Sequence, residues 1–583
     1  MSDTQLSFDQ VVNPEQTQSI SYQPIKFDKT IRIAVTGDVR VTRAERRIID
    51  TPEFQRLRGV KQLGPSSWVY PTAVHTRFDH SLGVLQMVDE MVQSIREIVF
   101  QVPVSNGQEA IIEITDTQRK LARLYGLLHD VTHVPFGHTL EDELGIFPSH
   151  DAFQKAGTHQ DGLDRFELLL GDKSQIGQIL IEEHGHEFYS RFKNIFVRGG
   201  RDRLQHSEGG RVVCDEIIYF LVSDTVCADL LDYVKRDSFF SSIDLNLSFR
   251  FLKFMYVADV PIASLRNERR RRLVIRLWKP KTGRARRDIM TDLAGLMEAR
   301  YMIAERIYFH PTKLIVGAMI GRAVLEAKRL RCLSAEELLA HSDDSLLREL
   351  IDLDKLKGGD PEEQKSRKIA SKLALAVVHR RLFKCQHRYT DKSFGRAGDN
   401  VNLKEDALHA LKDADRRRDI ENEIADWGGV NHGDVLVYAA PRKMNSKVAD
   451  VQVDWQGQLV RLSDISDPVL SNRLKTIEAA HKELWGIDLI VSDELSAEQR
   501  EQVQFAFEAK FLGRERAREC YMQLARDVID QEEKFSNYPP ESKRKTARTI
   551  ADKLAEAGLA FHGKASVRTR IVELASEIMS DRL

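Results

Sequence analysis

The sequence predicts a mainly α-helical protein that carries small β-hairpins and a C-terminal α+β subdomain. From Ala44 to about Val260, apolar residues recur mostly at helical spacing, as in "LGVLQMVDEMVQSIREIV". Short stretches of alternating apolar and polar residues interrupt the helices at only a few places. The 583 residues are too many for one hydrophobic core, and the composition (42% hydrophobic, 30% charged) is ordinary for a globular protein.

We divide the chain into four parts. Residues 1–27 are polar and predict a flexible N-terminal arm. Residues 28–330 form the main helical core, with an N-terminal hairpin at "KTIRIAVTGDVRVT" and a basic hairpin at 266–287 whose turn is "KPKTG". Residues 331–496 form the α+β subdomain, with "VLVYAAPRKM" and "VADVQVDWQGQLVRL" as strands. Residues 497–583 are charged and predict a helical extension, broken at "NYPPES".

Charge and cysteine usage exclude several classes of protein. Lys+Arg 87 against Asp+Glu 88 gives a net charge of -1, so the whole chain is no generic nucleic-acid binder. The five cysteines include no C-x-x-C pair, which argues against a disulfide framework or zinc knuckle and favours a reducing cytosol. There is no secretory signal and no apolar run long enough to span a membrane, so we expect a cytoplasmic protein without membrane partners.

The basic hairpin departs from this neutral average. Eleven of the 22 residues from Arg266 to Arg287 are Lys or Arg, opposed only by Glu268. Such a stretch could bind nucleotide phosphates at a subunit interface, nucleic acid, or an acidic regulatory protein. It could also be a solvated hairpin edge whose charge prevents strand pairing.

The stretch "LYGLLHDVTHVPFGHTLEDELG" concentrates histidines and carboxylates beside an apolar helix. On a helix, His129 and His133 would share a face, with Asp130 offset by about 100°. The chain must leave the helix at Pro135, which places His138 on a following loop that can fold back. Taken alone, the stretch could equally be the solvent-exposed side of a helix.

Two other segments supply groups that complete a site. "HTRFDHSLGV" places Arg77 and His80 just before an apolar helix. "ADLLDYVKRDS" places Asp229, Tyr233 and Asp237 at i, i+4 and i+8, a polar stripe on one helical face inside an apolar region. Two histidines and two aspartates from separate segments could form an N2O2 site for a divalent transition metal, which suits Mn, Fe, Zn or Co more than Ca or Mg.

Four motifs, in order, resemble those of the HD-domain metal-dependent phosphohydrolases: "IIDTPEFQRLRGVKQLG", "HTRFDHSLGV", "HDVTHVPFGH" and "LLDYVKRDS". The similarity is greatest to the branch that hydrolyses deoxynucleoside triphosphates (dNTPs), and it covers roughly Lys29 to Ser492. The resemblance implies an HD-domain helical core and one divalent metal, Mn, Fe or Mg, with Zn or Co as further candidates. The implied ligands are His80, His129, Asp130 and Asp229.

The resemblance also implies catalytic roles for His133, His138, His159 and Glu141. We favour His138 as the acid that protonates the leaving 5′-oxygen and His133 as its partner, and the reverse assignment stays open. His159 would support this relay, or it is a surface histidine. Glu141 stands where the family usually has Asp and would orient the attacking water.

The remaining matched residues concern nucleotide recognition. Those matching the family's substrate contacts are Gln62, Leu63, Arg77, Tyr233, Asp237, Arg300 and Tyr308. Those matching an activating-nucleotide site between subunits are Asp50, Gln55 and Arg58; as an alternative, Asp50 caps the helix that begins near Pro52.

The expected function is metal-dependent hydrolysis of dNTPs to deoxynucleoside and inorganic triphosphate. We expect control by a nucleotide activator and a homo-oligomer, dimer or tetramer. Depletion of dNTPs starves replication, so housekeeping of nucleotide pools and anti-phage defence both stay open. One alternative is a phosphodiesterase or nuclease that acts on single strands or cyclic nucleotides, favoured by the basic hairpin. Another is a non-enzymatic nucleotide sensor, which the intact ligand set disfavours.

Overall fold

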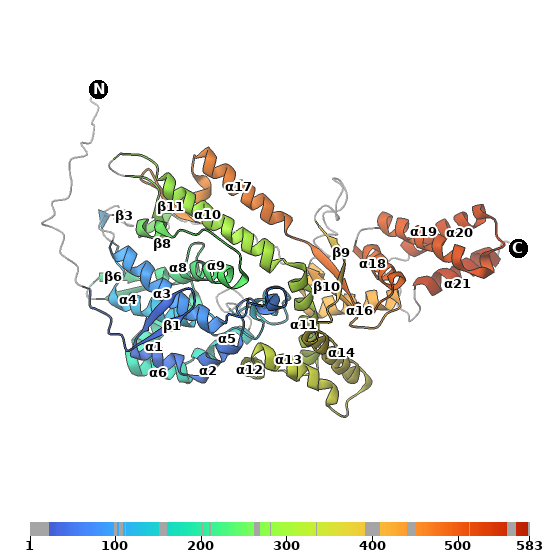
Figure 1. The fold of residues 1–583 in the computed structure, drawn as a ribbon, viewed down its shortest axis with the longest axis horizontal. Coiled ribbons are helices and arrows are strands. Elements are labelled where there is room, and N and C mark those ends of the chain that lie inside the picture. Colours follow the sequence, from blue (N-terminus) through green and yellow to red (C-terminus); the bar gives the residue numbers. More distant parts are fainter. Residues whose placement is uncertain are drawn as a thin grey trace, which may run out of the picture.

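The computed structural model in Figure 1 describes most of the chain. The described residues are 22–97, 102–103, 109–110, 112–150, 160–200, 202–208, 211–261, 269–279, 282–333, 335–390, 409–439, 451–511, 514–556 and 567–580. Most of the predicted N-terminal arm, residues 1–21, lies outside them. The last part of that arm packs against the core: Tyr22 lies under the Arg96 guanidinium at 3.8 Å, and Phe27 lies under Arg40 at 4.4 Å.

The N-terminal half is helical, as the apolar periodicity predicts. Its helices are α1 (Arg43–Ile49), α2 (Pro52–Gln55), α3 (Arg77–Arg96), α4 (Asp116–Leu128), α5 (Gln160–Leu170), α6 (Gln175–His184), α7 (His186–Arg198), α8 (Glu216–Ser223) and α9 (Ala228–Ser241). Short 3₁₀ turns lie at Arg56–Gly59, Gly64–Trp68 and Gly137–Thr139. The predicted N-terminal hairpin is confirmed as β1 (Lys29–Ile33) paired with β2 (Gly37–Val41).

Helix α3 lies at the centre of this half and packs on both α4 and α9. A capping box between Thr76 and Asp79 fixes its start, so His80 lies in the first turn. Gly83 allows the close approach of α9, because a Cβ at this position would lie 2.0 Å from Asp232 Oδ1. The sequence therefore places His80 against α9 through a helix cap and one glycine.

Small β-sheets, mainly antiparallel, lie beside the helices. Besides β1–β2, the pairs are β3 (Val102–Pro103) with β4 (Glu109–Ala110) and β5 (Gln205–Glu208) with β6 (Arg211–Cys214). A four-stranded sheet has the order β12-β11-β8-β7, from β12 (Gln458–Arg461), β11 (Gln452–Trp455), β8 (Arg269–Arg276) and β7 (Met255–Pro261). A three-stranded antiparallel sheet has the order β10-β13-β9, from β10 (Val435–Ala439), β13 (Ile487–Val491) and β9 (Lys384–Tyr389).

Two predictions about strand pairing differ from what the four-stranded sheet shows. We placed β11 and β12 in the C-terminal subdomain with β10, but β11 runs parallel to β8 of the core, with Val453 opposite Ile275. The basic strand β8 pairs with the preceding β7, and beyond it the predicted "KPKTG" turn closes only a single bridge between Trp278 and Ala285. Alternation of apolar and polar residues identifies a strand but not the strands that pair with it, because pairing depends on contacts between residues distant in sequence. Here buried Asp454 of β11 accepts hydrogen bonds from Arg276 Nε (2.8 Å) and Trp278 Nε1 (2.6 Å).

The rest of the chain is again mainly helical. Its helices are α10 (Arg287–Ile303), α11 (Pro311–Arg329), α12 (Ala335–Ala340), α13 (Asp343–Asp352), α14 (Pro361–Val378), α16 (Ala414–Gly428), α17 (Pro468–Glu483), α18 (Ala497–Phe511), α19 (Arg514–Gln531), α20 (Pro540–Glu556) and α21 (Val567–Ser580), and a π turn at Ala304–Tyr308 follows α10. Helix α17 lies along α10, and α19, α20 and α21 pack together at the C-terminal end of the molecule (Figure 1). Within the described residues, no helix is both long and apolar enough to cross a membrane.

Candidate active site

The histidine-rich segment leaves its helix earlier than predicted. Helix α4 ends at Leu128, so His129 is the C-cap, and His129 and His133 do not share a helical face. Two hydrogen bonds of the i→i+3 type, Val131 N to Leu128 O (3.0 Å) and His133 N to Asp130 O (3.2 Å), tighten the chain after the helix. Pro135 cannot continue a helix and disfavours helical backbone in the residue before it, and the turn forms ahead of it.

The four predicted metal ligands come together from three elements. His80 Nε2 on α3 lies 3.1 Å from Asp229 Oδ1 on α9 and 3.7 Å from Asp130 Oδ2. His129 Nε2 lies 3.4 Å from Asp130 Oδ1 and 3.9 Å from Asp229 Oδ1. His80, His129 and Asp130 are buried, whereas the Asp229 side chain is 35% exposed. One side of the group is therefore open to an incoming molecule.

Hydrogen bonds to the other ring nitrogens fix the tautomers of both histidines. His129 Nδ1 lies 2.8 Å from the Gly126 carbonyl, which can only accept, so Nδ1 carries the proton. His80 Nδ1 lies 2.8 Å from Asp232 Oδ2, and Arg236 binds both oxygens of that carboxylate at 2.8 Å. Both Nε2 atoms then face the carboxylates, the arrangement of metal-binding histidines.

This donor set fits a divalent cation. Among the described residues, the buried Nε2 atoms of His80 and His129 have no hydrogen-bond partner. Burial lowers the pKa of His80, but the carboxylates of Asp229 and Asp232 outweigh burial and raise it to about 10. Burial would raise the pKa of Asp130, but the neighbouring His129 side chain and the Arg77 guanidinium hold it well below its usual value. Two carboxylates facing two imidazole nitrogens attract a cation of the Mn, Fe or Zn type.

His133 stands between this group and a second one. Its Nε2 lies 3.3 Å from Asp130 Oδ1, and its Nδ1 lies 2.7 Å from Glu141 Oε2. Arg165 binds the other side of Glu141, with Nη1 2.7 Å from Oε1. Burial, reinforced by the charge of Arg77, lowers the pKa of His133 to about 4. His133 is therefore neutral near pH 7.

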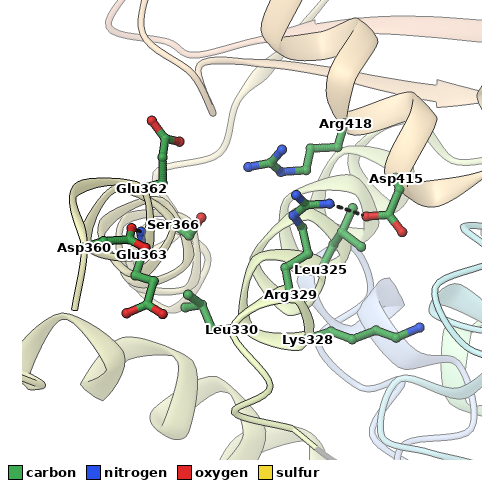
Figure 2. Close-up of a pocket in the computed structure, with 10 residues that line it drawn as sticks. All are labelled: Leu325, Lys328, Arg329, Leu330, Asp360, Glu362, Glu363, Ser366, Asp415 and Arg418. Atoms are coloured by element: carbon green, nitrogen blue, oxygen red, sulfur yellow. Dashed lines mark hydrogen bonds and ion pairs between the residues drawn. The ribbon is translucent and has the colours of Figure 1, made fainter.

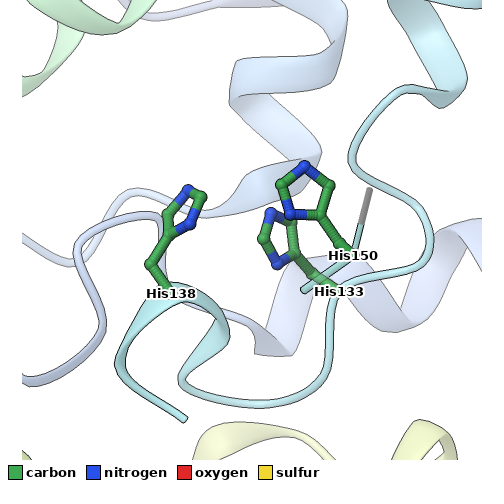
Figure 3. A group of neighbouring side chains, drawn as sticks. All are labelled: His133, His138 and His150. Carbon is green, nitrogen blue, oxygen red and sulfur yellow. The ribbon is translucent and has the colours of Figure 1, made fainter. Parts of the chain in front are cut away.

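The second group gathers three imidazoles, His133, His138 and His150 (Figure 3). The ring centroid of His133 lies 4.7 Å from that of His138 and 3.7 Å from that of His150. The His138 side chain is 50% exposed, and its Nδ1 lies 2.6 Å from Asp142 Oδ2. This contact with His138 helps hold the pKa of Asp142 below its usual value, against the effect of burial. An oriented and accessible imidazole beside an ionised carboxylate is suited to proton transfer.

Gly137 lies beside both the predicted metal ligands and the imidazole cluster, because Arg77 and His133 approach its backbone closely. Gly137 has a left-handed backbone (φ 32), and a Cβ there would lie 2.5 Å from Arg77 Nη2 and 3.2 Å from His133 Nδ1. Arg77 Nη1 in turn lies 2.5 Å from Asp130 Oδ2. The missing side chain of Gly137 therefore allows Arg77 to reach between Asp130 and the loop that carries His138.

Comparisons with known proteins agree with this geometry. Residues 77–214 match the family model of the HD domain, and residues 294–521 match that of the HD associated region. A deoxynucleoside triphosphate triphosphohydrolase SAMHD1 homolog of Dictyostelium discoideum is 28% identical over 61% of this chain and 60% of its own length. The human deoxynucleoside triphosphate triphosphohydrolase SAMHD1 is 28% identical over 51% of this chain and 44% of its own length.

The chain belongs to the HD-domain phosphohydrolase family. It spans about half the length of the curated relatives that it matches. A hypothetical protein from Aquifex aeolicus has the same fold, with a TM-score of 0.52 and 19% identity over 82% of this chain and 99% of that chain. The HD domain and the His/Asp donor set together support a site for a divalent metal in this chain.

Two predicted substrate residues, Asp237 and Tyr308, contact one another. Asp237, one turn beyond Tyr233 on α9, is buried and bound by His75 Nε2 and the Tyr308 hydroxyl, each at 2.9 Å. The buried Gln62 Oε1 has no hydrogen-bond partner among the described residues, and Leu63 beside it is 7% exposed. Gln62 thus retains an acceptor for a ligand hydroxyl.

The other predicted substrate residues differ from one another in their surroundings. Burial raises the pKa of Tyr233, and the nearby Arg300 on α10 opposes that rise. Arg77 is 1% exposed and bound to Asp130, so it contacts a metal ligand rather than open space. His159 lies outside the described residues.

Two of the three residues predicted for an activating nucleotide, Gln55 and Arg58, contact one another. Arg58 Nε donates to Gln55 Oε1 (2.8 Å), and the Arg58 guanidinium lies 3.7 Å from the centroid of the Phe78 ring. Asp50 is exposed and pairs with Arg46 at 3.5 Å. Our alternative role for Asp50 is wrong: Thr51 caps α2 and accepts from Phe54 N (3.3 Å).

A separate pocket of about 550 Å³ lies between α11, α14 and α16 (Figure 2). An ion pair between Arg329 and Asp415 (2.7 Å) crosses one wall, and Asp360 and Glu363 stand on the opposite side. None of our predicted site residues lines this pocket.

Sequence reasoning missed several residues of the active site. Asp232 gave a weak signal, since it follows Asp229 by three residues and precedes Arg236 by four, the spacing of a helical ion pair. His150 and Arg165 gave none, because they lie in or beyond an irregular segment where no periodicity relates them to His133.

Proposed function

We propose that this protein hydrolyses dNTPs to deoxynucleoside and inorganic triphosphate. The observation that carries the proposal is the two-part site: a His/Asp group suited to a cation, directly beside a cluster of imidazoles with an exposed member. The dNTP triphosphohydrolases among the relatives support this substrate class.

His80, His129, Asp130 and Asp229 would hold the metal. When bound, a divalent cation offsets negative charge on phosphate oxygens and lowers the pKa of water. Asp232 and the Gly126 carbonyl keep the two histidines in the tautomers that leave Nε2 free.

His138 is the residue we assign as general acid. Water attacks the α-phosphorus, the bond from phosphorus to the 5′-oxygen breaks, and His138 gives its proton to that oxygen. Asp142 orients the imidazole through Nδ1. His133, with a pKa of about 4, is neutral and suits a supporting role that Glu141 orients.

The test is a matrix of nucleotides. Purified protein is incubated with Mn²⁺ or Mg²⁺ and each dNTP, alone and in mixtures, and the products are separated by chromatography. We expect deoxynucleoside and inorganic triphosphate, and none from the control variant His129→Ala/Asp130→Ala. Absence of these products under every combination would overturn the proposal.

We extend the proposal to regulation, with Asp50, Gln55 and Arg58 as the site of an activating nucleotide in a dimer or tetramer. The exposure of Asp50 and Arg58 and the stacked Arg58 guanidinium support it. Hydrolysis of dNTPs would deplete their pool, and this depletion would serve either pool control or anti-phage defence. Size-exclusion chromatography with and without nucleotides tests it: Arg58→Ala should stay in the nucleotide-free oligomeric state, and a wild type unresponsive to every nucleotide would contradict it.

The described part of the basic stretch gives less support to a nuclease. Arg270 donates to the Gly200 carbonyl (3.0 Å), and Arg272 pairs with Asp224 (3.4 Å) and stacks on Phe220. These arginines serve the fold of the four-stranded sheet. Competition by single-stranded nucleic acid in the nucleotide matrix would reveal the alternative substrate.

A further inference from the structure

One buried carboxylate, distant in sequence, holds two active-site loops. Asp343 is the first residue of α13 and is 0% exposed. Its Oδ2 accepts from Lys61 N at 3.0 Å, and its Oδ1 accepts from Phe136 N at 2.8 Å. The first loop carries Gln62 and Leu63, and the second leads directly into His138.

The two loops touch one another as well as Asp343. Phe136 has a left-handed backbone (φ 58), which a non-glycine residue keeps only when its surroundings impose it. A Cβ on Gly64 would lie 3.5 Å from the Phe136 carbonyl oxygen, and a Cβ on Gly59 would lie 2.5 Å from Ser342 Cβ. The start of α13 is thus packed closely against both loops.

We propose that Asp343 is a positioning residue that fixes the Gln62–Leu63 loop relative to the loop of His138. Each carboxylate oxygen serves one loop, so the two loops cannot separate without leaving a buried amide or carboxylate oxygen unpaired. The consequence for catalysis rests on the proposed dNTP hydrolysis: the groups that read the sugar and the group that protonates its 5′-oxygen must keep a fixed distance.

Hydrogen–deuterium exchange tests the positioning role independently of any substrate. In Asp343→Ala both amides lose their acceptor, and in Asp343→Asn the side-chain amide can accept from only one of them. We expect exchange in peptides covering 60–64 and 134–139 to rise at least about tenfold in the Ala variant and in one of the two peptides in the Asn variant. Asp344→Asn is the matched control, since Asp344 is exposed and its carboxylate pairs with the Lys61 ammonium at 3.1 Å.

Activity and metal content complete the experiment. We expect Asp343→Asn to bind Mn²⁺ like the wild type, and to lose turnover together with discrimination between dNTPs and ribonucleotides. Unchanged exchange of both loops in Asp343→Asn would overturn the inference, as would lower activity with unchanged discrimination. A wild type that cleaves no dNTP would instead overturn the proposed function, and the exchange result would still be readable.

Discussion

The metal ligands and the proton-transfer histidines are held by different parts of the chain. His80 and Asp229 lie on the long helices α3 and α9, and the groups that orient His80 and His129 come from the same helical core. The segment from Val131 to His150 has little regular structure. It is held from both matched regions. From the HD domain Arg165 binds Glu141, and from the HD associated region Asp343 binds Phe136 N and Arg417 binds the Leu144 carbonyl.

This difference suggests a division of labour between the two matched regions. The HD domain supplies a cation site that local helix packing determines. The HD associated region adds contacts to the segment from Val131 to His150, whose backbone is hydrogen-bonded mainly in turns rather than in a helix or strand. Substitutions in the two regions should therefore separate metal binding from turnover.

The largest effect is expected for a metal ligand. His129→Ala removes one imidazole donor and leaves Asp130 and Asp229 facing each other without it. We expect loss of bound Mn²⁺, measured by elemental analysis, and a fall in hydrolysis of roughly 10³-fold or more, since several kcal/mol of charge stabilisation are lost. Retained metal with unchanged hydrolysis would remove His129 from the ligand set.

His138→Gln should lower turnover while leaving the metal in place. Removing a general acid typically costs about 10²–10⁴-fold in kcat. The glutamine keeps a polar group near Asp142 but cannot donate a proton, so single-turnover kinetics should show the loss in the chemical step. If kcat is unchanged and His133→Gln is inactive, the roles of these two histidines are reversed.

Asp232→Asn should weaken metal binding without removing a ligand. The amide can no longer both accept from His80 Nδ1 and pair with Arg236, so the tautomer of His80 is less well fixed. Loss of such an orienting partner costs about 10–100-fold in metal affinity. Titration with Mn²⁺ measures it, with the exposed Asp38→Asn as control; equal affinities would contradict our account of His80.

The smallest effect concerns stability and pH at Asp343. Burial raises the pKa of Asp343 to about 6, above the value of an unfolded chain. The stabilisation that Asp343 contributes to the fold is therefore complete below a pH of about 4, and it is lost as the pH rises through about 6. Relative to Asp343→Asn, the wild type should lose about 1–2 kcal/mol of unfolding free energy between pH 5 and 8. Urea denaturation at each pH measures it, and a constant or rising difference would contradict the assignment.

The sequence predicted the helices of the site better than it predicted the contacts between distant segments. Apolar periodicity predicted α3 and α9, because this signal is local, but α3 begins at Arg77 and so contains His80, which we had placed just before the helix. The pairing of β11 with β8 and the contact between Asp343 and Phe136 depend on residues far apart in the chain. A motif indicates which residues take part, but not the buried partners that orient them.

The most direct test of the account follows the oxygen of the attacking water. The wild-type enzyme is supplied with Mn²⁺ and a dNTP in water enriched in ¹⁸O, and both products are analysed by mass spectrometry. We predict ¹⁸O in inorganic triphosphate and none in the deoxynucleoside, because water attacks the α-phosphorus and His138 protonates the leaving 5′-oxygen. Label in the deoxynucleoside, or release of a nucleoside monophosphate in place of triphosphate, would contradict this account.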